Sequence, residues 1–270
     1  MRWNFDVGKL VFNFIVFIII LIISLPIVMV IVVSFSSSGF RLPPSGLTLE
    51  WYIKAFNYKV FRSGIYVSFL VAITSSVIAT IIGTMASFAF VRYHFKYKNL
   101  VNIFFMSPLM IPVVILSLAI YIFLVRVGLS GGVLALVIGH TVLIIPFSIR
   151  TVTASLQNFD ISLEEAAINV GAVPTTAIFR ITLPIIKTGI IAGTMMSFII
   201  SWNNYALSIF LVKPGSVTLP IQLFDYIKFE WDPSSAAIAS FLIFLSGVII
   251  IIIDRFIGLS VVMGIERKNI

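Results

Sequence analysis

The sequence predicts an all-α membrane protein with six transmembrane helices in a single transmembrane domain over residues 1–270. Hydrophobic residues make up 60% of the chain, charged residues only 10%, and the mean hydropathy is +1.16. A soluble domain of this length would need more charge to cover its surface. The charged residues also leave six uncharged runs, each long enough for the roughly 20 helical residues that cross a bilayer. Because lipid offers the backbone no hydrogen-bond partners, these runs are expected to be helices.

The predicted spans cover approximately residues 10–33, 63–91, 99–125, 131–151, 188–212 and 234–256. The first apolar run exceeds the ~7–15 residues of a signal-peptide core, so we expect it to remain as a helix. After it, Thr48 through Phe61 is expected to form a short amphipathic helix capped by Ser45 or Thr48. Prolines within the third and fourth spans predict kinked helices at Pro108, Pro112 and Pro146.

The distribution of basic residues predicts the orientation of the six spans. Eleven of the 18 Lys and Arg residues lie on the side that holds both termini, and seven lie on the other side. The short loop Arg92–Lys98 carries three of the eleven, and short basic loops are those that set topology. We therefore predict a multi-pass protein of the cytoplasmic (inner) membrane with both termini in the cytoplasm. Contact with the lipid bilayer explains the net charge of +8, so nucleic acid is not expected as a partner.

The cytoplasmic loop over residues 158–186 carries the clearest local pattern. Ser162 and Glu165 have the spacing of a capping box, and an apolar face follows at helical spacing. Gly171 stands where a left-handed residue would end that helix, and Pro174 suits the first turn of a second helix. Pro184 would then mark the entry into the fifth span. From local physics alone, a helix pair that only joins two spans is an equally good interpretation.

The spacing of this loop resembles a known family in full. Glu-Ala-Ala, three residues, Gly, nine residues and Ile-x-Leu-Pro is similar to the signature of permease subunits of ATP-binding-cassette importers. The resemblance implies the type I ABC importer permease fold, in which a short coupling helix docks in a groove of the ATPase subunit. The residues to which it assigns this coupling are Glu164, Glu165, Ala166, Ala167, Gly171, Leu183 and Pro184.

The same resemblance implies the partners of the chain: an ATP-binding subunit dimer, a second permease subunit and an extracytoplasmic solute-binding protein. ATP and Mg would be bound by the ATPase, because this sequence has no Gly-x-x-x-x-Gly-Lys-Ser/Thr loop. No cofactor is expected on the chain itself. With no cysteine, two histidines and no acidic residue in the middle of a span, neither a metal site nor a catalytic pair is expected, and the chain is predicted not to be an enzyme.

Other segments resemble permeases of the spermidine/putrescine type, a branch that also handles opines and phosphonates. These segments include Ser34–Ser38, Met106–Pro112, Gly139–Thr141, Ser197–Phe198 and Thr218–Pro220. The resemblance implies a small polar solute. A polyamine would favour carboxylates along its route, and none falls in the middle of a span. The pair Trp202-Asn203 is similar to sugar permeases instead, so a sugar importer stays an alternative.

Four amphipathic residues in the fifth span are candidates for the translocation route: Trp202, Asn203, Asn204 and Tyr205. On a helix they would point around most of its circumference, so some must face an interior or a partner. Packing between helices is an equally good interpretation. An ion-coupled secondary transporter is the alternative of another class, and it needs an ionisable group near the middle of the membrane. His140 is the one candidate for that group, and a structural hydrogen bond is the more common role of such a residue.

Overall fold

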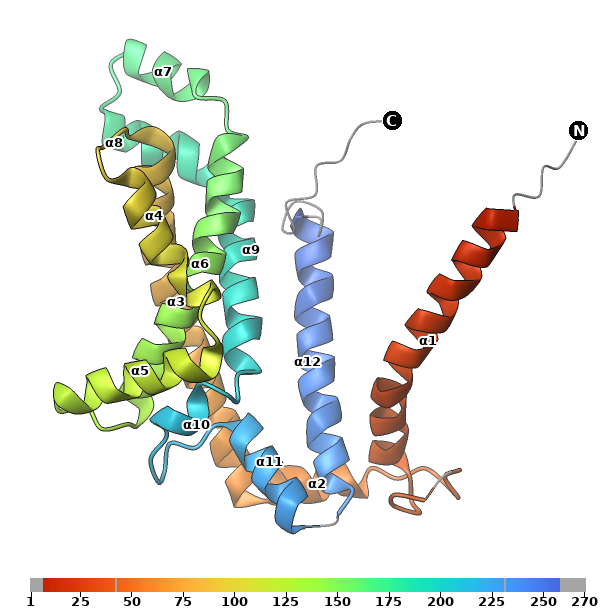
Figure 1. The fold of residues 1–270 in the computed structure, drawn as a ribbon. Helices are drawn as coiled ribbons and strands as arrows, with labels where there is room; N and C mark the ends of the chain where they lie inside the picture. The colour runs from red at the N-terminus through yellow and green to blue at the C-terminus, as the bar shows by residue number, and fades with distance from the viewer. Residues whose placement is uncertain (1–6, 42, 231, 258–270) are drawn as a thin grey trace, which may run out of the picture. The chain divides into compact units, whose positions relative to one another are not determined.

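The computed structural model describes residues 7–41, 43–230 and 232–257, and these residues are almost entirely helical (Figure 1). An isolated antiparallel bridge joins Ser36 to Leu47. In chain order the elements are α1 (Val7–Phe35), α2 (Glu50–Asn57), α3 (Lys59–Arg92), α4 (Lys98–Met106), η1 (Ser107–Leu109), α5 (Val113–Arg126), α6 (Val133–Gln157), α7 (Ser162–Asn169), α8 (Pro174–Ala177), η2 (Ile178–Thr182), α9 (Leu183–Trp202), α10 (Ser208–Leu211), α11 (Leu219–Phe229) and α12 (Ser234–Ile257).

Within these residues, five helical segments are long and apolar enough to cross a membrane: α1, α3, α6, the run from α8 to α9, and α12. A sixth span results if α4, η1 and α5 are counted together. The prediction of a six-span helical membrane protein is confirmed in this form. The third span, however, is not a kinked helix, because its two halves meet at 107°.

Two prolines account for this sharp bend. Pro108 lies in η1 and Pro112 immediately precedes α5. Neither residue has an amide hydrogen to continue a helical ladder, and the short stretch between them leaves the α-helical path. Pro146 behaves differently, because α6 runs through it without interruption.

The chain folds as two compact units, which we describe separately. The first comprises residues 1–61 and 223–244. In it, Trp51 Nε1 donates a hydrogen bond to the Ser36 carbonyl (2.8 Å), and the hydroxyls of Ser34 and Tyr52 are 2.8 Å apart. The single helix predicted for residues 48–61 is wrong, because extended backbone at Tyr58 separates α2 from α3.

The second unit comprises residues 62–222 and 245–270, and its centre is the pairing of α6 with α9. Small residues line this interface. The hydroxyls of Ser148 and Ser197 are 2.9 Å apart, and a Cβ atom on Gly189 would come within 2.6 Å of the Ser155 Cβ. The two helices therefore approach more closely than larger side chains would permit, as membrane helices with small residues do.

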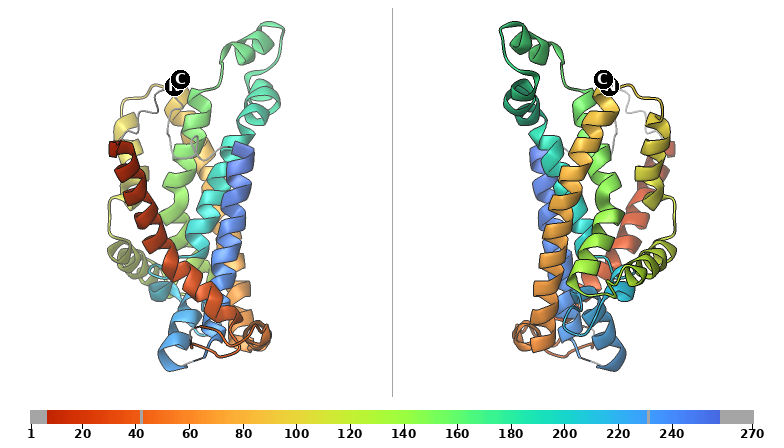
Figure 2. Two further views of the ribbon diagram at one scale, coloured as in Figure 1. Left: turned by 90° about the vertical axis from the view of Figure 1, so that its right-hand side faces the viewer. Right: turned by 90° about the vertical axis from the view of Figure 1, so that its left-hand side faces the viewer.

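The ends of the α6–α9 pair carry different elements. Figures 1 and 2 show α7 and α8 at one end, and α5 and α10 near the other. An apolar cluster that includes Leu136, Ile144, Leu207 and Leu211 fills the space beside α5 and α10. The second unit thus places the loop over residues 158–186 and the segment after Trp202 at opposite ends of the α6–α9 pair.

Several predicted boundaries differ from the observed ones. α6 extends to Gln157, beyond the predicted residue 151, and α9 ends at Trp202, well before residue 212. α11 was not predicted at all. α12 covers the predicted sixth span, and the tail from residue 258 onward lies outside the described residues.

Candidate functional site

The first turn of α7 is capped differently from the prediction. Ser162 lies within the helix rather than at its cap, and the predicted capping box with Glu165 is wrong. Asp160 supplies the oxygen instead: its Oδ1 accepts a hydrogen bond from the Ser162 amide at 3.0 Å. The hydrogen bonds from the Ser162 side chain and amide also hold the pKa of Asp160 below its ordinary value. Aspartate and serine accept backbone hydrogen bonds at a helix start equally well. The local sequence was therefore compatible with either Asp160 or Ser162 in this role.

The predicted end of α7 is confirmed in detail. Gly171 has a φ of +98°, a conformation that other residues adopt only at a cost. Its amide donates to the Ile168 carbonyl (2.9 Å), and the Ala172 amide donates to the Ala167 carbonyl (3.0 Å). This pair of bonds is the Schellman motif. Pro174 then occupies the first turn of α8, as predicted.

The side chains of α7 are accessible to another protein. None of its residues is buried. Glu165 and Ala166 are exposed, Leu163 is 47% exposed, and Val170, directly after the helix, is 87% exposed. Ala166 and the partly exposed Ala167 lie on the same helix as exposed apolar side chains, so another protein can approach this surface closely.

Glu164 does not share this exposure. Its Oε2 accepts hydrogen bonds from Arg92 Nη2 at 3.2 Å and from Thr182 Oγ1 at 2.6 Å. The Glu164 side chain is only 14% exposed, and that of Arg92 is 15% exposed. The Arg92 guanidinium also lies 5.3 Å from the ring of Phe159. Glu164 therefore joins α7 to the rest of the second unit, while Glu165 remains available to a partner.

The Ile-x-Leu-Pro part of the signature lies at the N-terminal end of α9. Ile181 and Leu183 pack against an apolar cluster of Val152, Leu156, Phe159 and Ile186, whereas Pro184 is exposed. Pro184 does not open a separate span: α8, η2 and α9 form one run from Pro174 to Trp202. η2 is a π-helical turn, and it falls where Pro184 cannot donate to the Arg180 carbonyl.

The fifth span ends at the first of the four residues predicted to line the route. α9 stops at Trp202, so the assumption that Trp202 to Tyr205 continue on one helix is wrong. Trp202 is 1% exposed, with its ring centroid 4.5 Å from that of Phe69 and 6.0 Å from that of Phe198. Among the residues that the structure describes, its indole Nε1 has no hydrogen-bond partner. Trp202 thus packs in an aromatic cluster with Phe69 and Phe198.

The next three residues form the break between α9 and α10. Asn203 is exposed, and its Nδ2 donates to the Ile199 carbonyl (3.1 Å) and to Ser246 Oγ (3.0 Å). Asn204 Oδ1 accepts from the Leu207 amide at 2.8 Å, and Tyr205 is half-buried. Non-helical backbone at membrane depth is stable only where protein or water satisfies it, so the two amides perform that role here.

His140 has the structural role that the sequence favoured. It is 1% exposed, its Nδ1 lies 2.7 Å from Ser201 Oγ, and its Nε2 lies 3.0 Å from Ser208 Oγ. Ser208 Oγ gives its own hydrogen to the Asn204 carbonyl at 2.6 Å. Nε2 must therefore donate to Ser208, and Nδ1 accepts from Ser201. A histidine with both nitrogens satisfied in this way fixes the break to α6.

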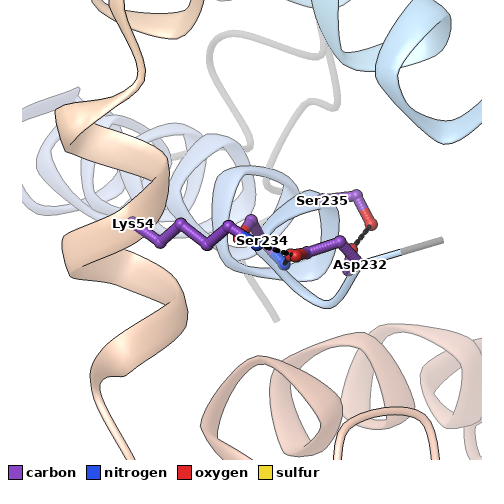
Figure 3. A network of polar contacts seen from close by, with 4 residues as sticks. All are labelled: Lys54, Asp232, Ser234 and Ser235. Carbon is purple, nitrogen blue, oxygen red and sulfur yellow. Dashed lines mark hydrogen bonds and ion pairs between the residues drawn. The ribbon is translucent and has the colours of Figure 1, made fainter. Parts of the chain in front are cut away.

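An ion pair in the first unit was not predicted. Lys54 of α2 donates to Asp232, whose Oδ1 also accepts from the Ser234 amide at 2.7 Å (Figure 3). The bond to Asp232 raises the pKa of Lys54. Burial alone would raise the pKa of Asp232, but the bonds from Lys54 and Ser234 hold it below its ordinary value. The Asp-x-Ser spacing could have revealed the cap of α12, whereas no local signal points to Lys54.

Comparisons with known proteins agree with this geometry. Residues 79–261 match the family described as binding-protein-dependent transport system inner membrane component. The spermidine/putrescine transport system permease protein PotC of Escherichia coli (strain K12) is 30% identical over 227 residues, which cover 84% of this chain and 86% of that protein. The putrescine transport system permease protein PotI of the same strain is 27% identical over 231 residues, 83% and 82% of the two chains. The crystal structure of a bacterial ABC transporter involved in the import of the acidic polysaccharide alginate has a similar fold, with a TM-score of 0.75 at 14% identity over 95% of this chain and 99% of that one.

Proposed function

The chain belongs to the binding-protein-dependent transport system inner membrane components, the permease subunits of ATP-binding-cassette importers, and from this premise we propose that it forms half of the translocation route for a polyamine or a closely related small polar solute. The relatives named for spermidine and putrescine support the solute class. The observation that carries the proposal is the exposed, sharply ended α7 on a chain that also has the helices to span the membrane.

In this proposal α7 is the coupling helix. Ala166 and Ala167 let a groove of the ATPase approach the backbone, and Glu165 is free to pair with a basic residue of that subunit. Gly171 ends the helix sharply, while Leu183 fixes the loop to the apolar root of α9 and Pro184 completes the motif. ATP and Mg would reside on the ATPase dimer, and closure of that dimer would move α7.

The remaining partners follow from the same proposal. A second permease subunit would complete the route, and the apolar side chains exposed along α1 suit contact with that subunit or with lipid. An extracytoplasmic solute-binding protein would deliver the solute from the side opposite α7. Residues 1–270 would act as a single permease domain, with both termini on the cytoplasmic side of the inner membrane.

The break after α9 is the best-supported part of the route. Discontinuous helices in transporters commonly carry the solute site, because their free carbonyls and side chains can hold a ligand. A cationic solute needs such oxygens when no carboxylate lies in the middle of a span, as in this sequence. A sugar would need an exposed ring for stacking, and Trp202 is buried. The observed cluster therefore favours the polyamine-type solute over the sugar.

The test uses the full importer in proteoliposomes, with the binding protein supplied on the external side. We expect uptake of radiolabelled spermidine or putrescine only when ATP is present on the cytoplasmic side. Uptake that follows an ion gradient without ATP would contradict the importer mechanism, and ATP-driven uptake of a sugar alone would contradict the solute class. For the route, Asn203→Ala and Asn204→Ala should each reduce uptake, whereas Asn99→Ala, on the exposed start of α4, should not.

A further inference from the structure

We propose that Arg92, Glu164 and Thr182 form a polar link, here called the loop clasp, that transmits the movement of α7 to α3 and to the root of α9. This inference rests on the proposed coupling role of α7 and assigns a task to three residues that need not touch the ATPase. Arg92, Glu164 and Thr182 would act as positioning residues for ATP-driven transport.

The geometry places one carboxylate oxygen at the meeting point of three elements. Glu164 Oε2 accepts from Arg92 at the end of α3 and from Thr182 in the π-helical turn η2. Within the part of the chain that the structure describes, no other side chain of α7 makes a hydrogen bond to another helix. A displacement of α7 therefore acts on α3 through Glu164, and it acts on the start of α9 through Glu164 as well as through the chain that joins α7 to α8.

The burial of the clasp gives this link its strength. Thr182 is fully buried, and the other two side chains are about 85% covered. In such surroundings an ionised hydrogen bond is less screened than at the surface, so its separation is more costly. Arg92 is also held against the Phe159 ring, which keeps the guanidinium in place when α7 moves.

The form of the Arg92–Glu164 contact permits rotation. A bidentate pair would hold the carboxylate and guanidinium in one plane. Here only Nη2 of Arg92 donates to Glu164, at 3.2 Å, and Nε has no hydrogen-bond partner in the described part of the chain. α7 can thus rotate about Glu164 Oε2 while the hydrogen bond to Arg92 stays intact, so movement of α7 is still passed to α3.

The wide turn η2 explains why Thr182 can reach Glu164. A π-helical turn adds a residue to the helix and so shifts the direction of the side chains around it. Thr182 faces the interior, whereas Phe179 in the same turn is 70% exposed. The π turn that accommodates Pro184 therefore also delivers the hydroxyl that connects α9 to the loop.

The experiment compares variants of the complete importer in proteoliposomes. Thr182→Val keeps the volume and removes the hydroxyl, Thr182→Ser keeps the hydroxyl, and Glu164→Gln removes the charge. Lys96→Gln, on the neighbouring loop, is the control for loss of a charge. We measure the retention of the ATPase on purification, the melting temperature, and the stimulation of ATP hydrolysis by the solute-loaded binding protein.

If the clasp transmits movement, Thr182→Val and Glu164→Gln retain the ATPase but lose stimulation and uptake by about threefold to thirtyfold. Thr182→Ser and Lys96→Gln stay close to wild type. Stimulation equal to wild type in Thr182→Val and Glu164→Gln would overturn the inference. Loss of the ATPase from these variants would overturn it as well, because the residues would then serve docking or folding. A wild-type complex that neither retains an ATPase nor imports with ATP would instead refute the proposed function.

Discussion

Replacement of Gly189 by alanine tests whether close contact between α6 and α9 stabilises the second unit. A Cβ atom at this position would lie 1.8 Å from Ser155 Oγ and 2.6 Å from Ser155 Cβ. The hydroxyl can rotate away, but Ser155 Cβ belongs to the rigid part of α6, so the helices must separate. Such overpacking costs about 1–3 kcal/mol. The better helix propensity of alanine returns roughly 0.8–1 kcal/mol, which leaves a net destabilisation of up to about 2 kcal/mol.

The assay is thermal unfolding of the purified chain in detergent. A loss of about 1 kcal/mol lowers Tm by roughly 2–4 °C in a domain of this size. Gly247→Ala is the matched control, since a Cβ at Gly247 in α12 meets no atom of the described residues within 4 Å. Ser155→Gly in combination with Gly189→Ala should recover most of the loss. If Gly189→Ala melts at the same temperature as Gly247→Ala, the helices are not held at the distance that the structure shows.

Three further predictions address single contacts. Asp232 has a depressed pKa, so the stability that its ion pair contributes is present above the ordinary value of 3.8 and is lost as the pH falls through the lower folded value. Lys54 has a raised pKa, so its share is present below 10.5 and is lost as the pH rises through the higher folded value. The difference in Tm between wild type and Asp232→Asn should therefore be constant from about pH 5 to 9 and shrink toward the acid end; a difference that grows in acid would contradict the pair. His140→Ala removes two buried hydrogen bonds and leaves a cavity, and unfolding measurements should show a loss of roughly 2–4 kcal/mol, with His140→Gln less affected. Gly171→Val places a branched residue at a φ of +98° and should weaken ATP-driven uptake, while Gly171→Asn should be tolerated; equal activity of the two variants would refute a conformational role.

The sequence predicted the features that depend on local chemistry. Apolar runs located the spanning helices, and Gly171 and Pro174 located the end of α7 and the start of α8. Local chemistry could not choose between two good acceptors for the cap of α7, and Asp160 replaced Ser162 in that role. Proline within an apolar run also led to two different structures. The chain breaks between α4 and α5, where two prolines lie four residues apart, but α6 continues through Pro146.

What could not be predicted depends on contacts between distant residues. Glu164 and Glu165 are adjacent and chemically alike, yet only Glu164 meets Arg92, which lies 72 positions earlier in the chain. The termination of α9 at Trp202 is similar. The pair Asn203-Asn204 is a local turn signal, and Asn204 Oδ1 accepts from the Leu207 amide. The other bonds that stabilise the break come from His140 and Ser246, which lie far away in the sequence. These are also positions for which a role in transport is proposed.

The link between the two candidate sites follows from the small residues of α9. Gly189, Gly193 and Ser197 recur at four-residue intervals and keep α9 in close contact with α6. Since such an interface deforms little, a displacement applied at Thr182 moves α6 and α9 together rather than bending one against the other. The first point at which the helical run of α9 can change conformation is the break after Trp202. His140 connects this break to α6 by hydrogen bonds. A displacement of α7 is therefore expected to change the conformation of residues 203–207, where the route has been proposed. The structure of α6 and α9 between these two sites should change little.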